Sequence, residues 1–170
     1  MSLEDGWLEY GDTVVAPLEI RGVLALALGL EELDLHEDLP VMIADQRLIC
    51  AVPNTMFLDG IEPDFERLNA LCLEVAVRGL LVFTFPGRGG CFTDSRHFVL
   101  RADRVLEEAA SPDAHAALAA YLCANQFFDD GPRTFSGAQG YRFGQRSRLE
   151  VRFNASGNSA RDVWVREVKQ

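Results

Sequence analysis

No apolar run in this 170-residue chain approaches the roughly 18 to 20 residues that a membrane-spanning helix requires. The chain also shows no apolar export segment, because its first residues, MSLEDGWLEYGD, are mostly acidic and polar. These two absences predict a protein that does not bind or cross a membrane and that resides in the cytoplasm.

Cysteine and histidine are too few and too scattered to indicate a metal site. The chain has no Cys-x-x-Cys pair, and its four cysteines stand far apart, at Cys50, Cys72, Cys91 and Cys123. Its three histidines, His36, His97 and His115, have no metal-ligand spacing either. We therefore expect neither a zinc site nor a disulfide framework, and we interpret the cysteines as buried thiols.

Positive charge is scarce in the first part of the chain. The whole chain has a formal charge of −10, and residues 1–70 hold 15 acidic but only 3 basic residues. Residues 71–170 hold 11 acidic and 13 basic residues. An acidic protein of this kind repels nucleic-acid phosphate, so nucleic acid is not an expected partner.

Apolar residues are abundant enough, at 48% of the chain, to form one well-packed core. A short helix is expected over 22–28, and an amphipathic helix begins after Asp64 and ends near Gly79, which suits a left-handed terminal position. Apolar runs bounded by turn residues predict strands over 13–20, 40–44, 47–53, 80–85, 91–100, 147–154 and 160–168.

The segment 114–124, AHAALAAYLCA, differs from the other predicted helices because it is small or apolar on almost every face. A helix that is hydrophobic all round is a buried helix. The expected fold class is therefore α+β, with a strongly curved, mostly antiparallel, barrel-like sheet wrapped around this central helix.

The start of this helix carries a family resemblance. Residues 107–121 read EEAASPDAHAALAAY, where PhzF-like proteins usually read EDPA(T/S)GSAH followed by AALAAY. Residues 95–98, SRHF, resemble the family's SRFF strand, and residues 139–147, QGYRFGQRS, resemble its QGxxMGRPS. The chain thus resembles the C-terminal half of a PhzF-like protein, the phenazine-biosynthesis branch of the diaminopimelate-epimerase fold.

The resemblance also implies a missing half. Members of this family are about twice as long as this chain and hold their active site between two similar halves. On this pattern, residues 1–19 form a crossover segment and residues 20–170 form a single domain. The half that supplies the main acid/base glutamate is absent, so the resemblance implies a homodimer or a separate N-terminal half as partner.

The activity implied by the resemblance is a cofactor-independent isomerisation or epimerisation of a small carboxylate by proton transfer. In the family motif an Asp assists the proton transfer, and a Gly-Ser pair opens the helix whose N–H groups hold an anion. Here Glu108 stands at the Asp position, Pro112 at the Gly position and Asp113 at the Ser position. Pro112 has no N–H to donate, and Asp113 places a negative charge where the anion would bind.

The same residues also make a good helix start that needs no ligand. Ser111 is a favourable N-cap residue, Pro112 suits the first helical position, and Asp113 complements the helix dipole. Glu108 is then an exposed loop carboxylate beside Glu107, unless burial raises its pKa and makes it a general acid.

Three interpretations remain open at this point. The first is an isomerase-like enzyme with a degenerate motif, which rebuilds the two-halved site by pairing two copies of this chain. The second is a non-catalytic domain of the same fold that binds a partner chain or a small ligand, and the third is one half of a longer enzyme or of an enzyme with a separately encoded N-terminal half. His115 fits either a core position or the site, and Gln139, Gly140 and Gly144 are expected to shape a loop beside it. The predicted catalytic residue is Glu108, and the predicted binding residues are Ser111, Asp113, His115, Gln139, Gly140 and Gly144.

Overall fold

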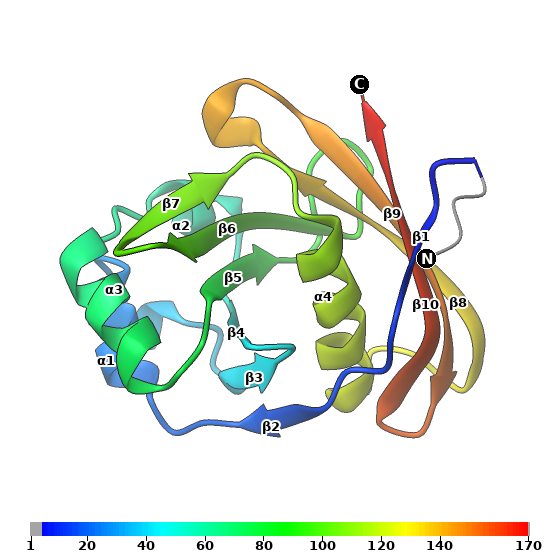
Figure 1. The fold of residues 1–170 in the computed structure, drawn as a ribbon, viewed down its shortest axis with the longest axis horizontal. Coiled ribbons are helices and arrows are strands. Elements are labelled where there is room, and N and C mark those ends of the chain that lie inside the picture. Colours follow the sequence, from blue (N-terminus) through cyan, green and yellow to red (C-terminus); the bar gives the residue numbers. More distant parts are fainter. Residues whose placement is uncertain (1–4, 170) are drawn as a thin grey trace.

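The computed structural model describes residues 5–169, which form one ten-stranded sheet curled around a helix (Figure 1). Along the sheet the strands follow the order β1-β10-β9-β8-β6-β5-β4-β3-β2, and β7 pairs with β6. Neighbouring strands are antiparallel except that β4 pairs with β5, and β6 with β8, in parallel.

The strands are β1 (Leu8–Tyr10), β2 (Val15–Pro17), β3 (Met42–Ala44), β4 (Arg47–Ala51), β5 (Gly79–Thr84), β6 (Thr93–Arg101), β7 (Arg104–Glu108), β8 (Gly131–Gln139), β9 (Ser147–Ser156) and β10 (Ser159–Lys169). The helices are α1 (Arg21–Ala27), α2 (Thr55–Asp59), α3 (Phe65–Glu74) and α4 (Pro112–Ala124), with single 3-10 turns η1 (Glu32–Asp34) and η2 (Tyr141–Phe143).

Helix α4 lies inside the curl of the sheet (Figure 1). Every residue from 114 to 123 is buried, and Leu118, Tyr121 and Leu122 are fully enclosed. The polar end of Tyr121 is satisfied inside the protein, since its hydroxyl donates to the Pro40 carbonyl at 2.7 Å. The prediction of a curved sheet around a buried central helix is therefore confirmed.

A second core fills the outer face of the sheet, where α1 and α3 pack (Figure 1). Leu48 and Leu80 belong to this second core, whereas their neighbours Ile49 and Leu81 belong to the core around α4. Because both faces of β4 and β5 are covered, every residue of these two strands is buried. This explains why their sequences are continuous apolar runs rather than alternating patterns.

Several predicted elements are confirmed with small changes in their limits. Asp64 caps α3, accepting a hydrogen bond from the Arg67 N–H at 3.1 Å. The final two predicted strands form a hairpin, and β3 pairs with β4 across Asp45 and Gln46. The strand predicted over 13–20 is reduced to the three residues of β2.

The predicted helix end at Gly79 is wrong. Helix α3 ends at Glu74, and the left-handed residue that follows it is Ala76, with φ of 57°. Gly79 instead opens β5, where a β-carbon would lie only 2.5 Å from the Phe98 carbonyl oxygen. Strands β7 and β8 were not predicted, because their sequences, RVLEE and GPRTFSGAQ, lack a continuous apolar run.

The close approach of α4 to β8 gives a test of this fold. A β-carbon on Gly137 would lie 2.5 Å from His115 Nε2 and 2.9 Å from Thr93 Oγ1. We expect Gly137→Ala to lower the free energy of unfolding by about 1–3 kcal/mol, because the methyl group overpacks this contact. Gly11→Ala is the matched control, since its β-carbon would meet nothing within 4 Å. Urea unfolding of both variants measures the difference, and equal stabilities would contradict the packing of α4 on β8.

Candidate functional site at the start of helix α4

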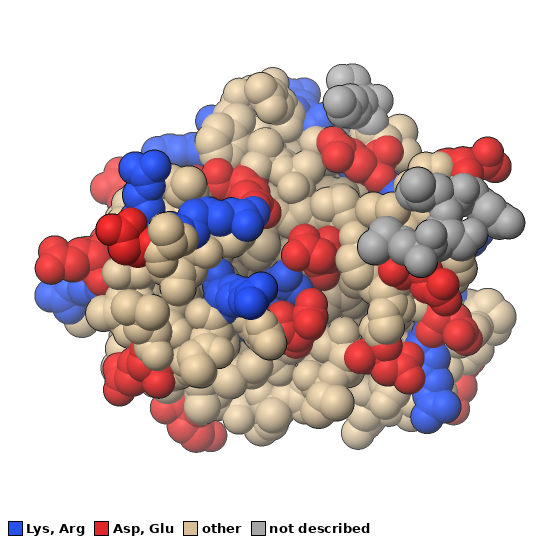
Figure 2. Space-filling view, in the orientation of Figure 1, with Lys and Arg blue, Asp and Glu red and all other residues tan. Residues whose placement is uncertain are grey.

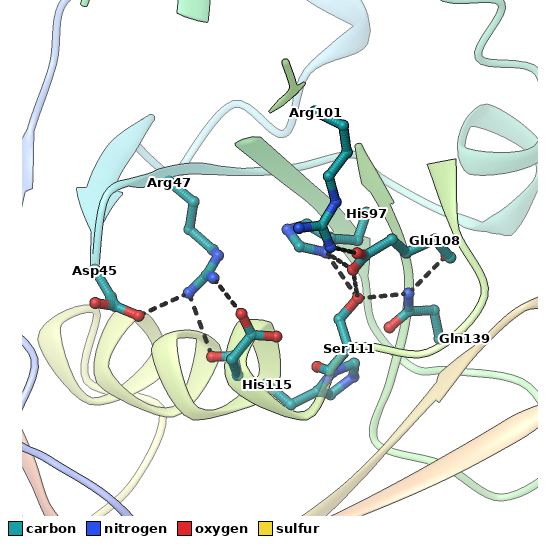
Figure 3. A network of polar contacts seen from close by, with 9 residues as sticks. Asp45, Arg47, His97, Arg101, Glu108, Ser111, His115 and Gln139 are labelled. Carbon is teal, nitrogen blue, oxygen red and sulfur yellow. Dashed lines mark hydrogen bonds and ion pairs between the residues drawn. The ribbon is translucent and has the colours of Figure 1, made fainter. Parts of the chain in front are cut away.

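Two strands end, and a third passes, close to the first turn of α4. Strands β6 and β7 pair so that His97 lies opposite Glu108, the last residue of β7. Strand β8 ends at Gln139, and Ser111 occupies the N-cap position of α4. These four side chains come from separate elements and meet at one point (Figure 3).

The Ser111 hydroxyl joins the four side chains in one hydrogen-bond network (Figure 3). It donates to Glu108 Oε2 at 2.8 Å, and its oxygen lies 2.7 Å from His97 Nδ1 and 3.3 Å from Gln139 Nε2. Gln139 Nε2 also donates to the backbone carbonyl of Glu108 at 2.9 Å. The predicted capping bond from the Ser111 side chain is wrong, since that side chain makes none. The carboxylate of Glu108 is a charged and therefore stronger hydrogen-bond partner.

Glu108 is held in its ionised form. Its side chain is 27% exposed at the end of β7, so it is not the exposed loop carboxylate that one reading of the sequence predicted. The hydrogen bond with His97 lowers its pKa most, burial opposes this, and bonds from Ser111 and Arg101 lower it further, to about 2. Arg101 NH2 donates to Oε1 at 2.5 Å. The pKa of Glu108 is thus lowered within this chain, whereas a general acid needs a pKa close to the working pH.

Asp113 is neutralised by an arginine from β4. Arg47 NH2 lies 2.7 Å from Asp113 Oδ2, and Arg47 NH1 donates to the Asp113 carbonyl at 3.3 Å (Figure 3). The same guanidinium lies 3.1 Å from Asp45 Oδ2, and its side chain is only 10% exposed. A cation therefore covers the first turn of α4, at the place where the sequence predicted a fixed negative charge.

Both sets of contacts line one cleft with a volume of about 420 Å³. Its charged lining consists of Arg47, Arg78, Arg101, Asp45, Glu108 and Asp113. Figure 2 shows arginine and carboxylate side chains gathered around a hollow near the middle of this face. Arg78 is exposed and, within residues 5–169, forms no ion pair, so it is the arginine of the cleft that is open to an added anion.

His115 lies behind the site rather than in the cleft. It is fully buried in α4, and its Nδ1 lies 3.0 Å from the Ser111 carbonyl oxygen, which can only accept. Burial lowers its pKa to about 4, so the ring is neutral at physiological pH. These features fit the core position that the sequence left open for His115.

The two glycines shape the neighbouring loop. Gly140 has φ of 91°, and a β-carbon there would collide with the Gln145 carbonyl and lie 2.8 Å from the Ala109 carbonyl. Gly144 has φ of 66° and ends η2, with open space around it. Neither glycine lines the cleft. Of the predicted binding set, the structure places Asp113 in the cleft and Ser111 and Gln139 directly behind Glu108.

Three side chains of this site were missed from the sequence: His97, Arg47 and Arg101. Strand alternation could have identified His97 and Arg101, because positions 97, 99 and 101 of β6 share one face of the sheet. The pairing of β6 with β7 then sets that face beside Glu108. Arg47 carries no such signal, because its contact with Asp113 spans 66 residues.

Other kinds of site find less support in the part of the chain that the structure describes. Between residues 5 and 169, no three His, Cys, Asp or Glu side chains are grouped closely enough to hold a metal ion. The same residues include no helix long and apolar enough to cross a membrane. All four cysteines are free and buried, as predicted.

The ionised state of Glu108 predicts how stability depends on pH. Its pKa is lower in the folded chain than the value of about 4.3 in an unfolded chain, so the network stabilises the fold fully above about pH 5. This stabilisation, on the order of 1–3 kcal/mol, is lost as the pH falls from about 4.5 through 2. We expect Glu108→Gln to be less stable than the unmodified chain at pH 7, with the difference closing at low pH.

Urea unfolding at a series of pH values measures this difference. Glu19→Gln is the control, because Glu19 is exposed and, within the described residues, takes part in no side-chain hydrogen bond or ion pair. If the free energies of unfolding of Glu108→Gln and the unmodified chain differ by the same amount at pH 7 and at pH 3, the ionised network is contradicted.

Comparisons with known proteins give the fold but no close relative. No family model and no curated protein matches the sequence. Among solved structures, a PhzF-family phenazine biosynthesis protein from Bacillus anthracis matches with a TM-score of 0.81 at 17% identity, over 96% of this chain and 58% of its own.

Two further structures agree with this match. A predicted epimerase from Pseudomonas aeruginosa gives a TM-score of 0.68 at 21% identity, over 95% of this chain and 56% of its own. A PhzF-family phenazine biosynthesis protein from Enterococcus faecalis gives a TM-score of 0.65 at 17% identity, over 98% of this chain and 59% of its own. The chain thus spans a little more than half the length of these proteins. It has the PhzF-like, diaminopimelate-epimerase-type fold that its motifs predicted.

Proposed function

We propose that this chain is one half of a cofactor-independent isomerase or epimerase, which moves a proton on a small carboxylate bound in the cleft at the start of α4. The observation that carries this proposal is the ionised Glu108, set beside His97 and Arg101 in a cleft of about 420 Å³. Proton transfer needs a base held close to a bound carbon acid, and binding of the acid needs a cation nearby.

The arginines of the cleft would bind the carboxylate of the substrate. Arg78 is exposed and has no acidic partner within the described residues, so its guanidinium can take the substrate carboxylate in a bidentate contact. Arg101 forms an ion pair with Glu108, and its side chain is 63% exposed. A substrate carboxylate that draws Arg101 away from Glu108 would raise the basicity of Glu108 as it binds.

Glu108 belongs with the groups that accept the proton rather than with those that donate it, because a carboxyl with a pKa of about 2 has no proton to give at neutral pH. A second group must return the proton to the opposite face, or to another carbon, of the substrate. The structural neighbours are longer than this chain, which covers 56–59% of them. We assign the second group to the other half of the site, from a second copy of this chain or a separate N-terminal half.

A second candidate function is a non-catalytic domain of the same fold that binds a partner chain or a small ligand. The ion pair between Arg47 and Asp113 favours it, because this pair closes the helix start against an anion. The low pKa of Glu108 also favours it, because a weak base is poorly matched to proton abstraction at pH 7.

Deuterium exchange separates the two candidates. We expect the full chain to speed the exchange of carbon-bound hydrogen in D₂O for small carboxylates with an activated C–H bond, beginning with pyruvate. Glu108→Ala should lower this rate by about 10²-fold or more, and Glu19→Gln should leave it unchanged. Proton NMR of the probe measures the rate. Binding of these carboxylates in the cleft without any exchange above buffer would overturn the isomerase proposal and support the binding domain.

The Arg47–Asp113 pair gives an independent test of anion binding. In Asp113→Ser, Arg47 keeps Asp45 but loses the nearer of its two carboxylate partners, and a hydroxyl replaces the fixed charge at the helix start. We expect malonate to bind this variant at least about tenfold more tightly than the unmodified chain, a change of about 1.4 kcal/mol. Asp12→Ser makes the same change in net charge outside the cleft and is the control. Equal affinities for all three proteins in an NMR titration would show that the pair does not close the helix start.

A further inference from the structure

We infer that His97 is the proton-accepting residue of this site, through Nε2, and that Glu108 and Ser111 position its ring. The inference rests on the proposed function and assigns the roles within it. It follows from the direction of each hydrogen bond in the network at the start of α4 (Figure 3).

The hydrogen bonds determine which nitrogen of His97 carries the proton. Nδ1 lies 2.7 Å from Ser111 Oγ and 3.2 Å from Glu108 Oε2. An ionised carboxylate can only accept, and Ser111 has already given its single hydrogen to Glu108. Both partners of Nδ1 are therefore acceptors, so Nδ1 carries the hydrogen.

The alternative, in which Ser111 turns its hydrogen toward His97, would leave two acceptor oxygens, Ser111 Oγ and Glu108 Oε2, 2.8 Å apart with no hydrogen between them. The Gln139 amide nitrogen donates to the Glu108 carbonyl at 2.9 Å, which fixes the amide's orientation. The same nitrogen points at Ser111 Oγ from 3.3 Å. Ser111 Oγ thus accepts from His97 and Gln139 and donates to Glu108, so its bonding capacity is used in full.

The neutral ring consequently has its lone pair on Nε2. This atom is buried and has no hydrogen-bond partner within the described residues. His97 and Gly79 both line the cleft, and a β-carbon at Gly79 would lie 3.4 Å from Nε2. The unpartnered lone pair therefore lies at the wall of the cleft, beside the Gly79 backbone.

The arrangement performs one balanced proton transfer. The substrate C–H bond breaks, its electron pair stays on the substrate as an enolate, and the proton forms an N–H bond at Nε2. The imidazolium that results is stabilised by the Glu108 carboxylate, which keeps its negative charge throughout. The reverse transfer, or transfer from the second half of the site, completes the isomerisation without any oxidant or reductant.

The charges that surround His97 are consistent with this role. Glu108 is the anion in contact with the ring, and Arg101 touches Glu108 rather than His97. Arg47 is occupied by Asp113 and Asp45. His97 also stands in the SRHF segment where the resembled strand motif reads SRFF, so the histidine accompanies the other departures at Glu108, Pro112 and Asp113.

Long-range ¹H–¹⁵N NMR of the full chain at pH 8 tests the assignment, because it identifies the tautomer of each histidine. The chain contains a reference for each form. His115 Nδ1 must donate to the Ser111 carbonyl, whereas His36 Nδ1 accepts from the Asp38 N–H at 3.3 Å. We expect His97 to match the Nδ1–H pattern of His115. An Nε2–H pattern like that of His36 would overturn the inference, whether or not any variant folds.

Two variants test the roles of the positioning groups. In Glu108→Ala, Ser111 regains a free hydrogen, so we expect His97 to lose its preference for Nδ1–H. In Glu108→Gln the amide oxygen still accepts, so the preference should remain. His115 and His36 should keep their patterns in both variants. An unchanged His97 tautomer in Glu108→Ala would show that Glu108 does not position the ring.

Deuterium exchange into pyruvate then separates this inference from the proposed function. We expect His97→Phe and His97→Gln to lose about 10²-fold or more of the exchange rate, with His36→Phe as the unaffected control. Exchange that persists in both His97 variants would assign the base to Glu108 and overturn the inference alone. Absence of exchange in the unmodified chain would overturn the proposed function, while the tautomer still decides how the network is arranged.

Discussion

Helix α4 has no polar face, and the rest of the fold depends on that constraint. A helix that is apolar all round must be enclosed on every side, which the sheet does by curling around it (Figure 1). Enclosure brings the ends of β7 and β8 and the middle of β6 to the first turn of α4. The helix start thereby meets polar side chains and the charged cleft.

Competition for the Ser111 hydroxyl decides what that helix start can do. A serine at this position ordinarily bonds to the first turn of its helix, but here the hydroxyl serves Glu108, His97 and Gln139. Arg47 compensates by covering the first turn through Asp113. Glu108 and Asp113, which differ from the PhzF pattern, therefore form two separate polar contacts rather than one open anion site.

The sequence was informative wherever a local pattern was strong. The all-apolar segment predicted the buried helix, continuous apolar runs predicted β4 and β5, and the motif order predicted the PhzF-like fold. It failed where long-range contacts decide the structure. Gly79 was wrongly predicted to end a helix. The reason for a glycine there is the Phe98 carbonyl oxygen on the neighbouring strand β6, and this contact cannot be read from the sequence. His97 and Arg47 were missed because their partners lie 11 to 14 and 66 residues away in sequence.

The central claim is that Ser111 links Glu108 to His97 instead of capping α4. A crystal structure of the full chain at neutral pH, at a resolution that shows side-chain rotamers, tests it most directly. The account predicts that Ser111 Oγ lies within hydrogen-bond distance of both Glu108 Oε2 and His97 Nδ1. A Ser111 side chain turned onto the backbone N–H groups of the first turn of α4, with Glu108 directed into solvent, would contradict it.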